Sequence, residues 1–173
     1  GKEITEPDLL KLLPADRWIL SKCNKLIREV TENMDKFELG IALQKVYDFI
    51  WDEFCDWYIE FVKQRMYNAK EEPESAGMAL WTLREVLKNA LKLLHPFMPF
   101  VTEEIYSKLI PQEESLMMSD WPQYKKEWEF PHAENVVEHL KLLASGVRNI
   151  RAEMNVPAGR KIKIYVVSQD QEL

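Results

Sequence analysis

The chain has 173 residues, of which 46% are hydrophobic and 30% charged, and its net charge is −6. This length suffices for one domain with a sizeable core, and the composition is that of a soluble globular protein. The acidic balance argues against binding polyanions through overall charge, and no apolar run approaches the ~20 residues that span a bilayer.

The first predicted elements are two amphipathic helices. Residues 1–14 are a lead-in ending at a proline, and Asp16 is the expected N-cap of a helix over about 16–35. The second helix, over about 40–68, is the strongest helical signal, because apolar residues recur along it every three or four positions. Its stripe consists of Leu43, Val46, Tyr47, Ile50, Phe54, Trp57, Tyr58, Phe61 and Val62.

A polar loop at 70–75 precedes a third helix, which should end at His95-Pro96 because proline disfavours helical geometry in the residue before it. Pro96 and Pro99 frame a turn in which we expect His95 to be structural and the Phe side chains to fill core. A shorter helix follows from Thr102-Glu103-Glu104 to about Leu109.

Residues 110–131 contain three prolines and no sustained period, which indicates an extended connector. The last helix shows a heptad-like seam from Val136 to Met154 and ends at Pro157-Ala158-Gly159. Alternation over 162–167 predicts one strand. A lone strand is unstable, so it pairs within a domain cut short at Leu173 or packs on the edge of the bundle.

The predicted fold is therefore all-α: a bundle of four main helices plus a short helix, followed by one C-terminal β-strand. We expect a lead-in linker at 1–14, the helical domain at 15–157, and a tail at 158–173 that leads to a following element. The N-terminus has neither a signal-peptide pattern nor a starting Met, so we expect a piece of a longer protein.

Sequence motifs for catalysis are missing. There is no Gly-rich phosphate loop and no Gly-x-Ser-x-Gly elbow. The one Glu-x-x-His spacing, Glu129 to His132, is interrupted by Pro131, so we predict no metal site and no catalytic residue. Cys23 and Cys55 fall within helical patterns and are expected to be buried thiols, which favours a cytoplasmic location.

Charge is distributed unevenly along the chain. Residues 11–29 carry five basic and two acidic side chains, and residues 140–163 carry six and one, whereas residues 32–60 carry two and eight. At helical spacing Asp52, Asp56 and Glu60 form one acidic row, which is either a solvated face or one that meets a cation or the amino groups of bases. The neighbours Trp57 and Tyr58 point roughly 100° apart, so one of them can present a stacking face.

Three segments now resemble the anticodon-binding domain of class I aminoacyl-tRNA synthetases, in the subgroup for valine, isoleucine and leucine. They are Asp16–Ser21, Asp48–Glu60 and Leu94–Ile105, and Ser119–Pro122 and Arg148–Glu153 continue the match. The stretch from Trp51 to Glu60 is most like the valine enzymes, with the isoleucine enzymes as the alternative. The similarity covers roughly residues 15–167.

The resemblance implies a parent valine–tRNA ligase that aminoacylates valine tRNA with ATP and Mg²⁺. Its catalytic signatures do not occur in this sequence, so the chain alone should be inactive and bind no cofactor. The implied task is to hold the anticodon stem-loop of valine tRNA isoacceptors, in covalent continuity with catalytic and editing domains. Two rival hypotheses are a helical protein–protein module, governed by exposed aromatics, and an enzyme with an unrecognised deep polar pocket.

The resemblance places the anticodon near the start of the first helix and an aromatic of the second. Trp57 would stack on a base unless it only fills core, and Asp56 or Glu60 would accept from an exocyclic amino group. Arg17 would offer a planar fork for RNA or pair with Asp16 or Glu53. The remaining candidates are Ser21 and Asn24 near the anticodon, Lys22, Lys25 and Arg28 on the RNA backbone, and Arg148 and Arg151, which flank the stem or neutralise the acidic second helix.

Overall fold

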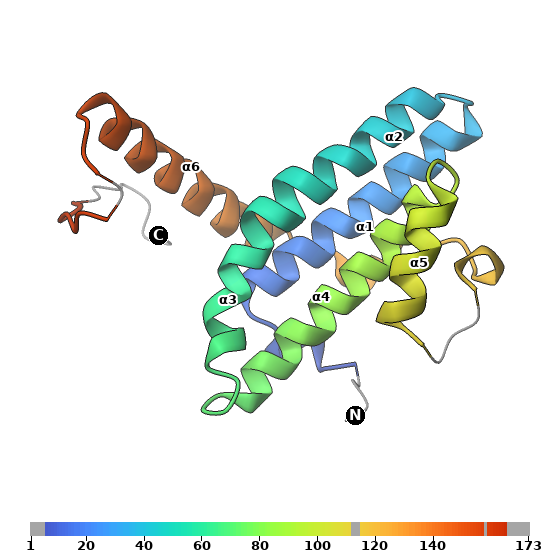
Figure 1. The fold of residues 1–173 in the computed structure, drawn as a ribbon, viewed down its shortest axis with the longest axis horizontal. Helices are drawn as coiled ribbons and strands as arrows, with labels where there is room; N and C mark the ends of the chain where they lie inside the picture. Colours follow the sequence, from blue (N-terminus) through green and yellow to red (C-terminus); the bar gives the residue numbers. More distant parts are fainter. Residues whose placement is uncertain (1–5, 112–114, 158, 166–173) are drawn as a thin grey trace.

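The fold is a helical bundle with one helix that projects from it (Figure 1). The computed structural model describes residues 6–111, 115–157 and 159–165, and these residues form helices and no strand. The helices are α1 (Pro14–Asp35), α2 (Leu39–Asp48), η2 (Phe49–Tyr58), α3 (Ile59–Tyr67), α4 (Pro73–Leu94), α5 (Pro99–Leu109) and α6 (Pro131–Glu153), with short 3-10 turns η1 (Leu9–Lys11), η3 (Leu116–Met118) and η4 (Lys126–Trp128).

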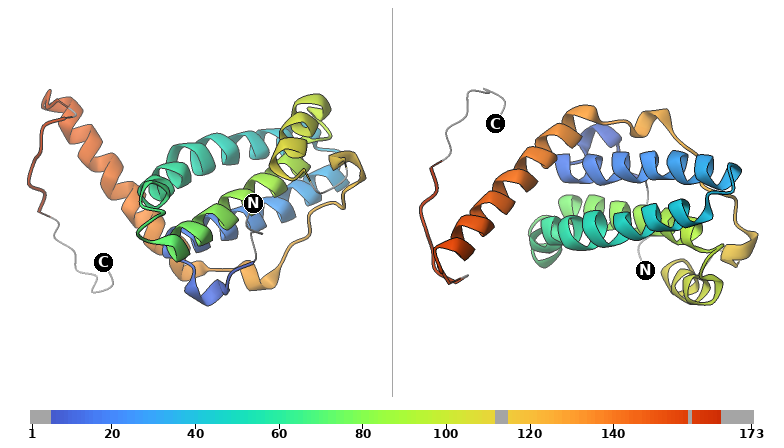
Figure 2. Two further views of the ribbon diagram at one scale, coloured as in Figure 1. Left: turned by 60° about the horizontal axis from the view of Figure 1, so that its bottom comes forward. Right: turned by 90° about the horizontal axis from the view of Figure 1, so that it is seen from above.

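Helix α1 is the centre of the bundle and packs against α2, α4 and α6 (Figure 2). The helices α2, η2 and α3 run on without a break, so the predicted four main helices and one short helix are all present. The largest side chains that are fully buried include Trp18 and Ile19 of α1, Tyr58 of η2 and Leu93 of α4. The core therefore lies between α1, the long second helix and α4.

A buried ion pair ties the start of α1 to α3. Helix α1 begins at Pro14, so the prediction of Asp16 as N-cap is wrong: Asp16 lies in the first turn and accepts a hydrogen bond from the backbone of Leu13, at 3.3 Å. The Asp16 carboxylate is completely buried and receives the Arg65 guanidinium at 2.7 and 2.9 Å and the Tyr58 hydroxyl at 2.7 Å. Arg65 also donates to the backbone and side chain of Ser75, which links α4 to the same pair.

Replacing Arg65 by Met tests this ion pair. It leaves the buried Asp16 carboxylate without its cation, so the free energy of unfolding should fall by about 3–5 kcal/mol. Lys63→Met is the matched control, because Lys63 lies on the same helix in an exposed pair with Glu60, and it should change little. Urea unfolding at pH 7 measures both variants. Equal losses would show that the Asp16–Arg65 pair does not hold the bundle together.

The second helix is wider than an α-helix in its middle. Over η2 the backbone takes the π pattern, in which the N–H of Ile59 reaches back five residues to the carbonyl of Phe54. The acidic row of Asp52, Asp56 and Glu60 was predicted from α-helical pitch, which does not hold here, although all three side chains are exposed. Of the adjacent aromatics, Tyr58 is buried and Trp57 is half-buried, so the prediction that they are not both fully buried is confirmed.

The turn between α4 and α5 forms as predicted, with α4 ending at Leu94 and α5 beginning at Pro99. His95 is structural, because its Nδ1 lies 2.8 Å from the hydroxyl of the buried Thr102. The prediction that the Phe side chains fill core holds only for Phe97. Phe100, in the first turn of α5, is 91% exposed.

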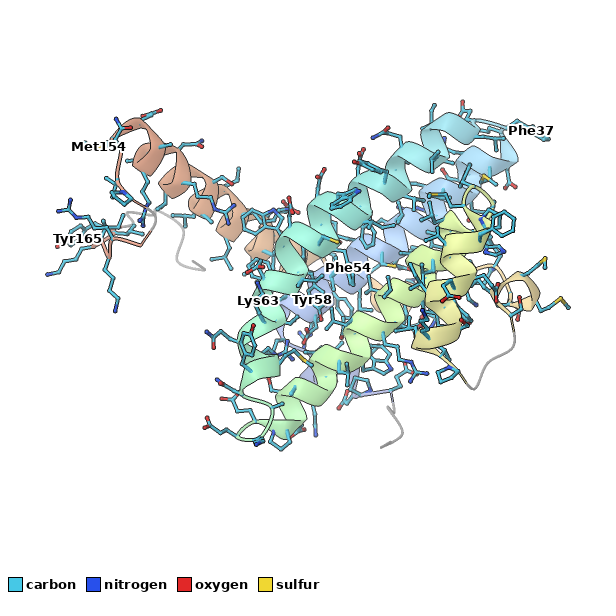
Figure 3. The ribbon with its side chains drawn as sticks, viewed as in Figure 1. Phe37, Phe54, Tyr58, Lys63, Met154 and Tyr165 are labelled. Carbon is cyan, nitrogen blue, oxygen red and sulfur yellow. The ribbon has the colours of Figure 1, made fainter. Side chains whose placement is uncertain are left out.

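Helix α6 begins at Pro131 and leaves the bundle halfway along its length (Figures 1 and 3). Its buried residues, Ala133 and Val137, lie in the first two turns. The predicted seam is therefore packed only near its start. We call the described residues from 142 onward, which project from the bundle, the arm. Met154 lies at the far end of α6 and is 71% exposed. The predicted strand is wrong for the part that is described, because residues 162–165 form no ladder; residues 166 and 167 lie outside the described residues.

Within the described residues, no helix combines the length and the apolar character needed to cross a bilayer.

Candidate nucleic-acid interface

The first turns of α6 are fastened to α1 by polar side chains. The Ser21 hydroxyl donates to Glu134, at 2.5 Å, and accepts from the backbone N–H of Phe130, at 3.1 Å. Lys25 forms an ion pair with the other oxygen of Glu134. Ser21 is 1% exposed, so these contacts hold the start of α6 rather than leaving Ser21 open to RNA.

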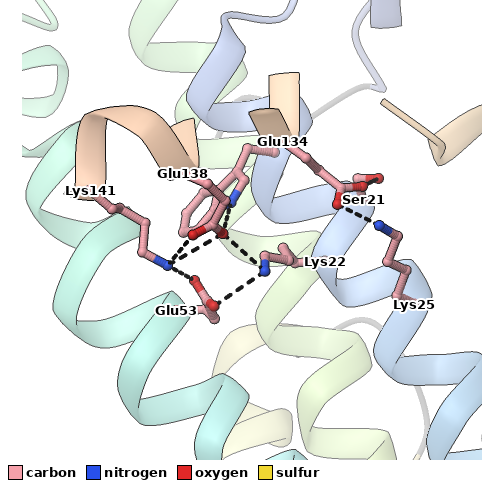
Figure 4. Close-up of polar contacts among 8 residues, drawn as sticks. Ser21, Lys22, Lys25, Glu53, Glu134, Glu138 and Lys141 are labelled. Atoms are coloured by element: carbon pink, nitrogen blue, oxygen red, sulfur yellow. Dashed lines mark hydrogen bonds and ion pairs between the residues drawn. The ribbon is translucent and has the colours of Figure 1, made fainter. Parts of the chain in front are cut away.

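A four-membered charge cluster joins α1, η2 and α6 next to these contacts (Figure 4). Glu53 of η2 contacts Lys22 of α1, at 3.4 Å, and Lys141 of α6, at 2.7 Å. Glu138 of α6 contacts the same two lysines, at 3.0 and 3.3 Å. The indole N–H of Trp18 also donates to Glu138, at 3.3 Å. Two cations and two anions thus alternate around a closed ring, which we call the clamp.

The clamp shifts the titration of its members. Burial works against the charged form of Lys22, but the hydrogen bond to Glu138 and the charges of Glu53 and Glu138 outweigh it and raise the pKa of Lys22. Partial burial opposes ionisation of Glu138, yet Lys22, Trp18 and Lys141 together lower its pKa below 4.5. Both groups are therefore charged near neutral pH.

Glu138→Gln should reveal this linkage as a pH-dependent loss of stability. Because the pKa of Glu138 is lowered by folding, its contribution is present above about pH 4.5, the ordinary value, and is lost as the pH falls through the lowered one. Glu138 is two-fifths exposed on its side chain, so the loss at pH 7 should not exceed about 1 kcal/mol. Urea unfolding should show a larger loss of unfolding free energy at pH 7 than at pH 3.

The control for that experiment is Glu153→Gln, an exposed carboxylate at the end of the same helix. It should leave the unfolding curve unchanged at both pH values. If Glu138→Gln lowered the free energy of unfolding by the same amount at pH 3 and pH 7, the ionisation of Glu138 would not be coupled to folding.

The part of the connector from Trp121 to Phe130 runs antiparallel along α1 and occupies more of the predicted site. The Asn24 side chain makes two hydrogen bonds to the backbone of Lys125, at 2.7 and 2.8 Å, and is 1% exposed. Further along, the Trp121 indole donates to Thr31, at 2.9 Å, and the exposed Arg28 lies over the Tyr124 ring, at 5.1 Å. The predicted RNA contacts of Asn24 and Ser21 are thus untested, whereas their role in holding α6 and the connector is visible.

Trp57 of η2 and Arg148 of α6 lie together beside Lys141 of the clamp. The half-buried Trp57 ring has the Arg148 guanidinium 5.2 Å from its centroid and the Lys141 ammonium 5.7 Å from it. Its inner edge packs against Phe61, with centroids 5.8 Å apart. Of the two predicted roles of Trp57, the structure shows its packing against the core, with two cations beside its ring, and the stacking on an RNA base stays a prediction.

The other predicted residues are scattered. Arg17 pairs with neither Asp16 nor Glu53; its guanidinium donates to the carbonyl of Leu10 and lies 5.9 Å from the Phe130 ring. Arg151 donates hydrogen bonds to the carbonyls of Pro157 and Arg160, and so holds these two residues close to the end of α6. Asp56 is exposed beside Trp57, and Glu60 is exposed and paired with Lys63.

Sequence reasoning missed three residues of the clamp and the glutamate that binds Ser21 and Lys25 next to it. They are Glu53, Glu138 and Lys141, and Glu134. The signal was present in part, because 134, 138 and 141 recur at helical spacing and share one face. That they face lysines of α1 depends on the angle between the helices, which no local pattern specifies.

The hypothesis of an unrecognised enzyme gains no support from the described residues. There, no group of three or more His, Cys, Asp or Glu side chains is arranged to hold a metal. The most strongly shifted groups are buried in the core: burial, then Asp16, raises the pKa of Tyr58, and burial raises the pKa of Cys23. Neither side chain lines a polar pocket that a substrate could enter, since both are 0% exposed.

Comparison with known proteins identifies the class. The family model described as the anticodon-binding domain of tRNA ligases matches residues 16–166, and the chain belongs to this family. The similar proteins are valine–tRNA ligases. That of Clostridium acetobutylicum is 48% identical over 170 residues, 97% of this chain and 19% of the relative. That of Thermotoga maritima is 39% identical over 176 residues, 99% of this chain and 20% of the relative.

The predicted resemblance to the anticodon-binding domain of the valine enzymes is thus confirmed. The chain spans about a fifth of the length of these relatives.

Proposed function

We propose that this chain is the part of a valine–tRNA ligase that recognises the anticodon stem-loop of valine tRNA isoacceptors. The observation that carries the proposal is the pairing of Trp57 with Arg148 on the outside of a domain whose family binds anticodons. A half-buried ring with cations beside it suits single-stranded RNA, because unpaired bases stack on aromatic rings and the cations attract phosphates.

The surroundings of Trp57 match the chemistry of an unstacked anticodon. Valine anticodons have A and C at their second and third positions, and both bases carry an exocyclic amino group. The exposed carboxylate of Asp56, next to Trp57 in the chain, is an acceptor for such a group. Arg148 supplies a planar cation for a phosphate or a base edge.

The basic arm extends this surface. Beyond Arg148, the described part of the chain carries Arg151, Arg160, Lys161 and Lys163 against Glu153. These cations would follow the backbone of the stem and give salt-dependent affinity without sequence preference. In this proposal Lys22 and Lys25 would contribute less than the cations of the arm, because each already faces one or more glutamates.

The wider protein would supply the chemistry. In this proposal the parent ligase joins valine to its tRNA with ATP and Mg²⁺ in domains outside this chain, and it works in the cytoplasm with no membrane partner. The chain itself would bind no cofactor and would be inactive alone.

Trp57→Ala tests the proposal. Wild-type protein at low salt should bind a stem-loop with A and C at the second and third anticodon positions more tightly than one with both bases changed. The substitution should remove this preference and weaken binding by about 1–3 kcal/mol, roughly 5- to 150-fold. Fluorescence anisotropy of labelled RNA measures both.

Trp51→Ala is the matched control, since Trp51 is an exposed tryptophan of the same helix that contacts Tyr47 rather than the clamp. It should keep the preference. Equal binding of both RNAs by wild-type protein would contradict anticodon reading, and an equal loss in the two variants would move the site away from Trp57. The rival hypothesis, a protein–protein module, instead predicts that RNA binding does not depend on the RNA sequence. It also predicts that the exposed Trp51 controls the binding of a protein partner.

A further inference from the structure

We infer that Lys141 is a positioning residue, which sets the angle at which α6 leaves the bundle and thereby keeps Arg148 over Trp57. The inference rests on the proposed function in so far as this pose serves RNA recognition. It assigns to Lys141 a role that neither the residue patterns nor the family resemblance suggests.

Lys141 makes more contacts between elements than any other residue of the clamp. Its ammonium lies 2.7 Å from Glu53, 3.3 Å from Glu138, 5.1 Å from the Trp18 ring and 5.7 Å from the Trp57 ring. It therefore touches α1, η2 and its own helix at once, with only 15% of its side chain exposed. Charge, hydrogen bonding and ring contact all fix one position for the ammonium.

Lys141 stands where α6 parts from the bundle. The buried residues of α6, Ala133 and Val137, precede it, and the residues that follow are half-exposed or exposed. Arg148 lies seven residues on, two helical turns and about 10 Å along the same face. Over this length a tilt of about 10° would displace Arg148 by roughly 2 Å, enough to lose its contact with the Trp57 ring.

Loss of the Lys141 charge would also upset the rest of the clamp. Glu53 would keep only Lys22, at 3.4 Å, and Lys22 would have to balance two carboxylates. Glu53 and Glu138 lie on elements that the clamp holds together, so their unbalanced repulsion would push α6 outward. The expected result is a wider range of α6 angles rather than an unfolded bundle, because Ser21, Lys25 and Glu134 still hold the first turns of α6.

The test measures this angle without RNA. Spin labels on Lys36→Cys, at the tip of the bundle, and Asn149→Cys, on the arm, report their separation in a Cys55→Ser background; Cys23 is buried and should not react. Lys141→Met keeps the length of the side chain and removes its charge, and should at least double the width of the distance distribution. Lys141→Arg should restore the width, and Lys108→Met, which breaks an exposed pair on α5, should not change it.

RNA discrimination is the second readout. Lys141→Met should lose the preference for A and C as Trp57→Ala does, and Lys141→Arg should regain it. An unchanged distance distribution in folded Lys141→Met protein would overturn the inference. If wild-type protein shows no preference while the distribution still widens, the proposed function fails and the positioning role stands.

Should Lys141→Met lower the helical circular dichroism, Glu53→Gln decides the question, since it removes the charge that Lys141 contacts on η2 while Lys141 itself stays in place. A widened distribution in that variant supports the inference, and an unchanged one overturns it.

Discussion

The buried carboxylate of Asp16 is the constraint on which the rest of the structure depends. A completely buried charge must be matched by a cation in fixed geometry, and Arg65 supplies it from α3 while Tyr58 adds a hydrogen bond from η2. This sets how the long second helix lies along α1. One consequence is that Glu53 faces Lys22, and that Trp57 lies beside the place where α6 leaves the bundle.

The surface of this domain reconciles a net charge of −6 with the RNA binding that we propose. Lysines of α1, which look like a basic patch in the sequence, are largely neutralised by glutamates of α6, and so they work as internal fasteners. Positive charge that is available to RNA lies instead on the arm beyond Lys141, next to the exposed side of Trp57. Because the fasteners are partly buried, salt should weaken binding to RNA more than it weakens the fold.

Periodicity was sufficient for the helices, because each buries an apolar stripe, and the angular separation of Trp57 and Tyr58 was sufficient to predict that at most one of them is fully buried. The local patterns could not show the π-helical widening of η2, since it changes hydrogen bonding without changing the apolar spacing. They also could not show that Ser21 binds Glu134 and that Asn24 binds the connector, because both partners lie far away in the sequence. The strand expected at 162–167 has no neighbour among the described residues to pair with.

The most direct test of the central claim is to follow the indole N–H signals of the six tryptophans by NMR during titration with the A-C stem-loop. The Trp57 signal should shift at the lowest RNA concentrations, while those of Trp81 and Trp128, which are buried in contact with each other, should stay in place. A titration in which Trp57 stays fixed while the RNA binds would show that the anticodon is read elsewhere on the domain.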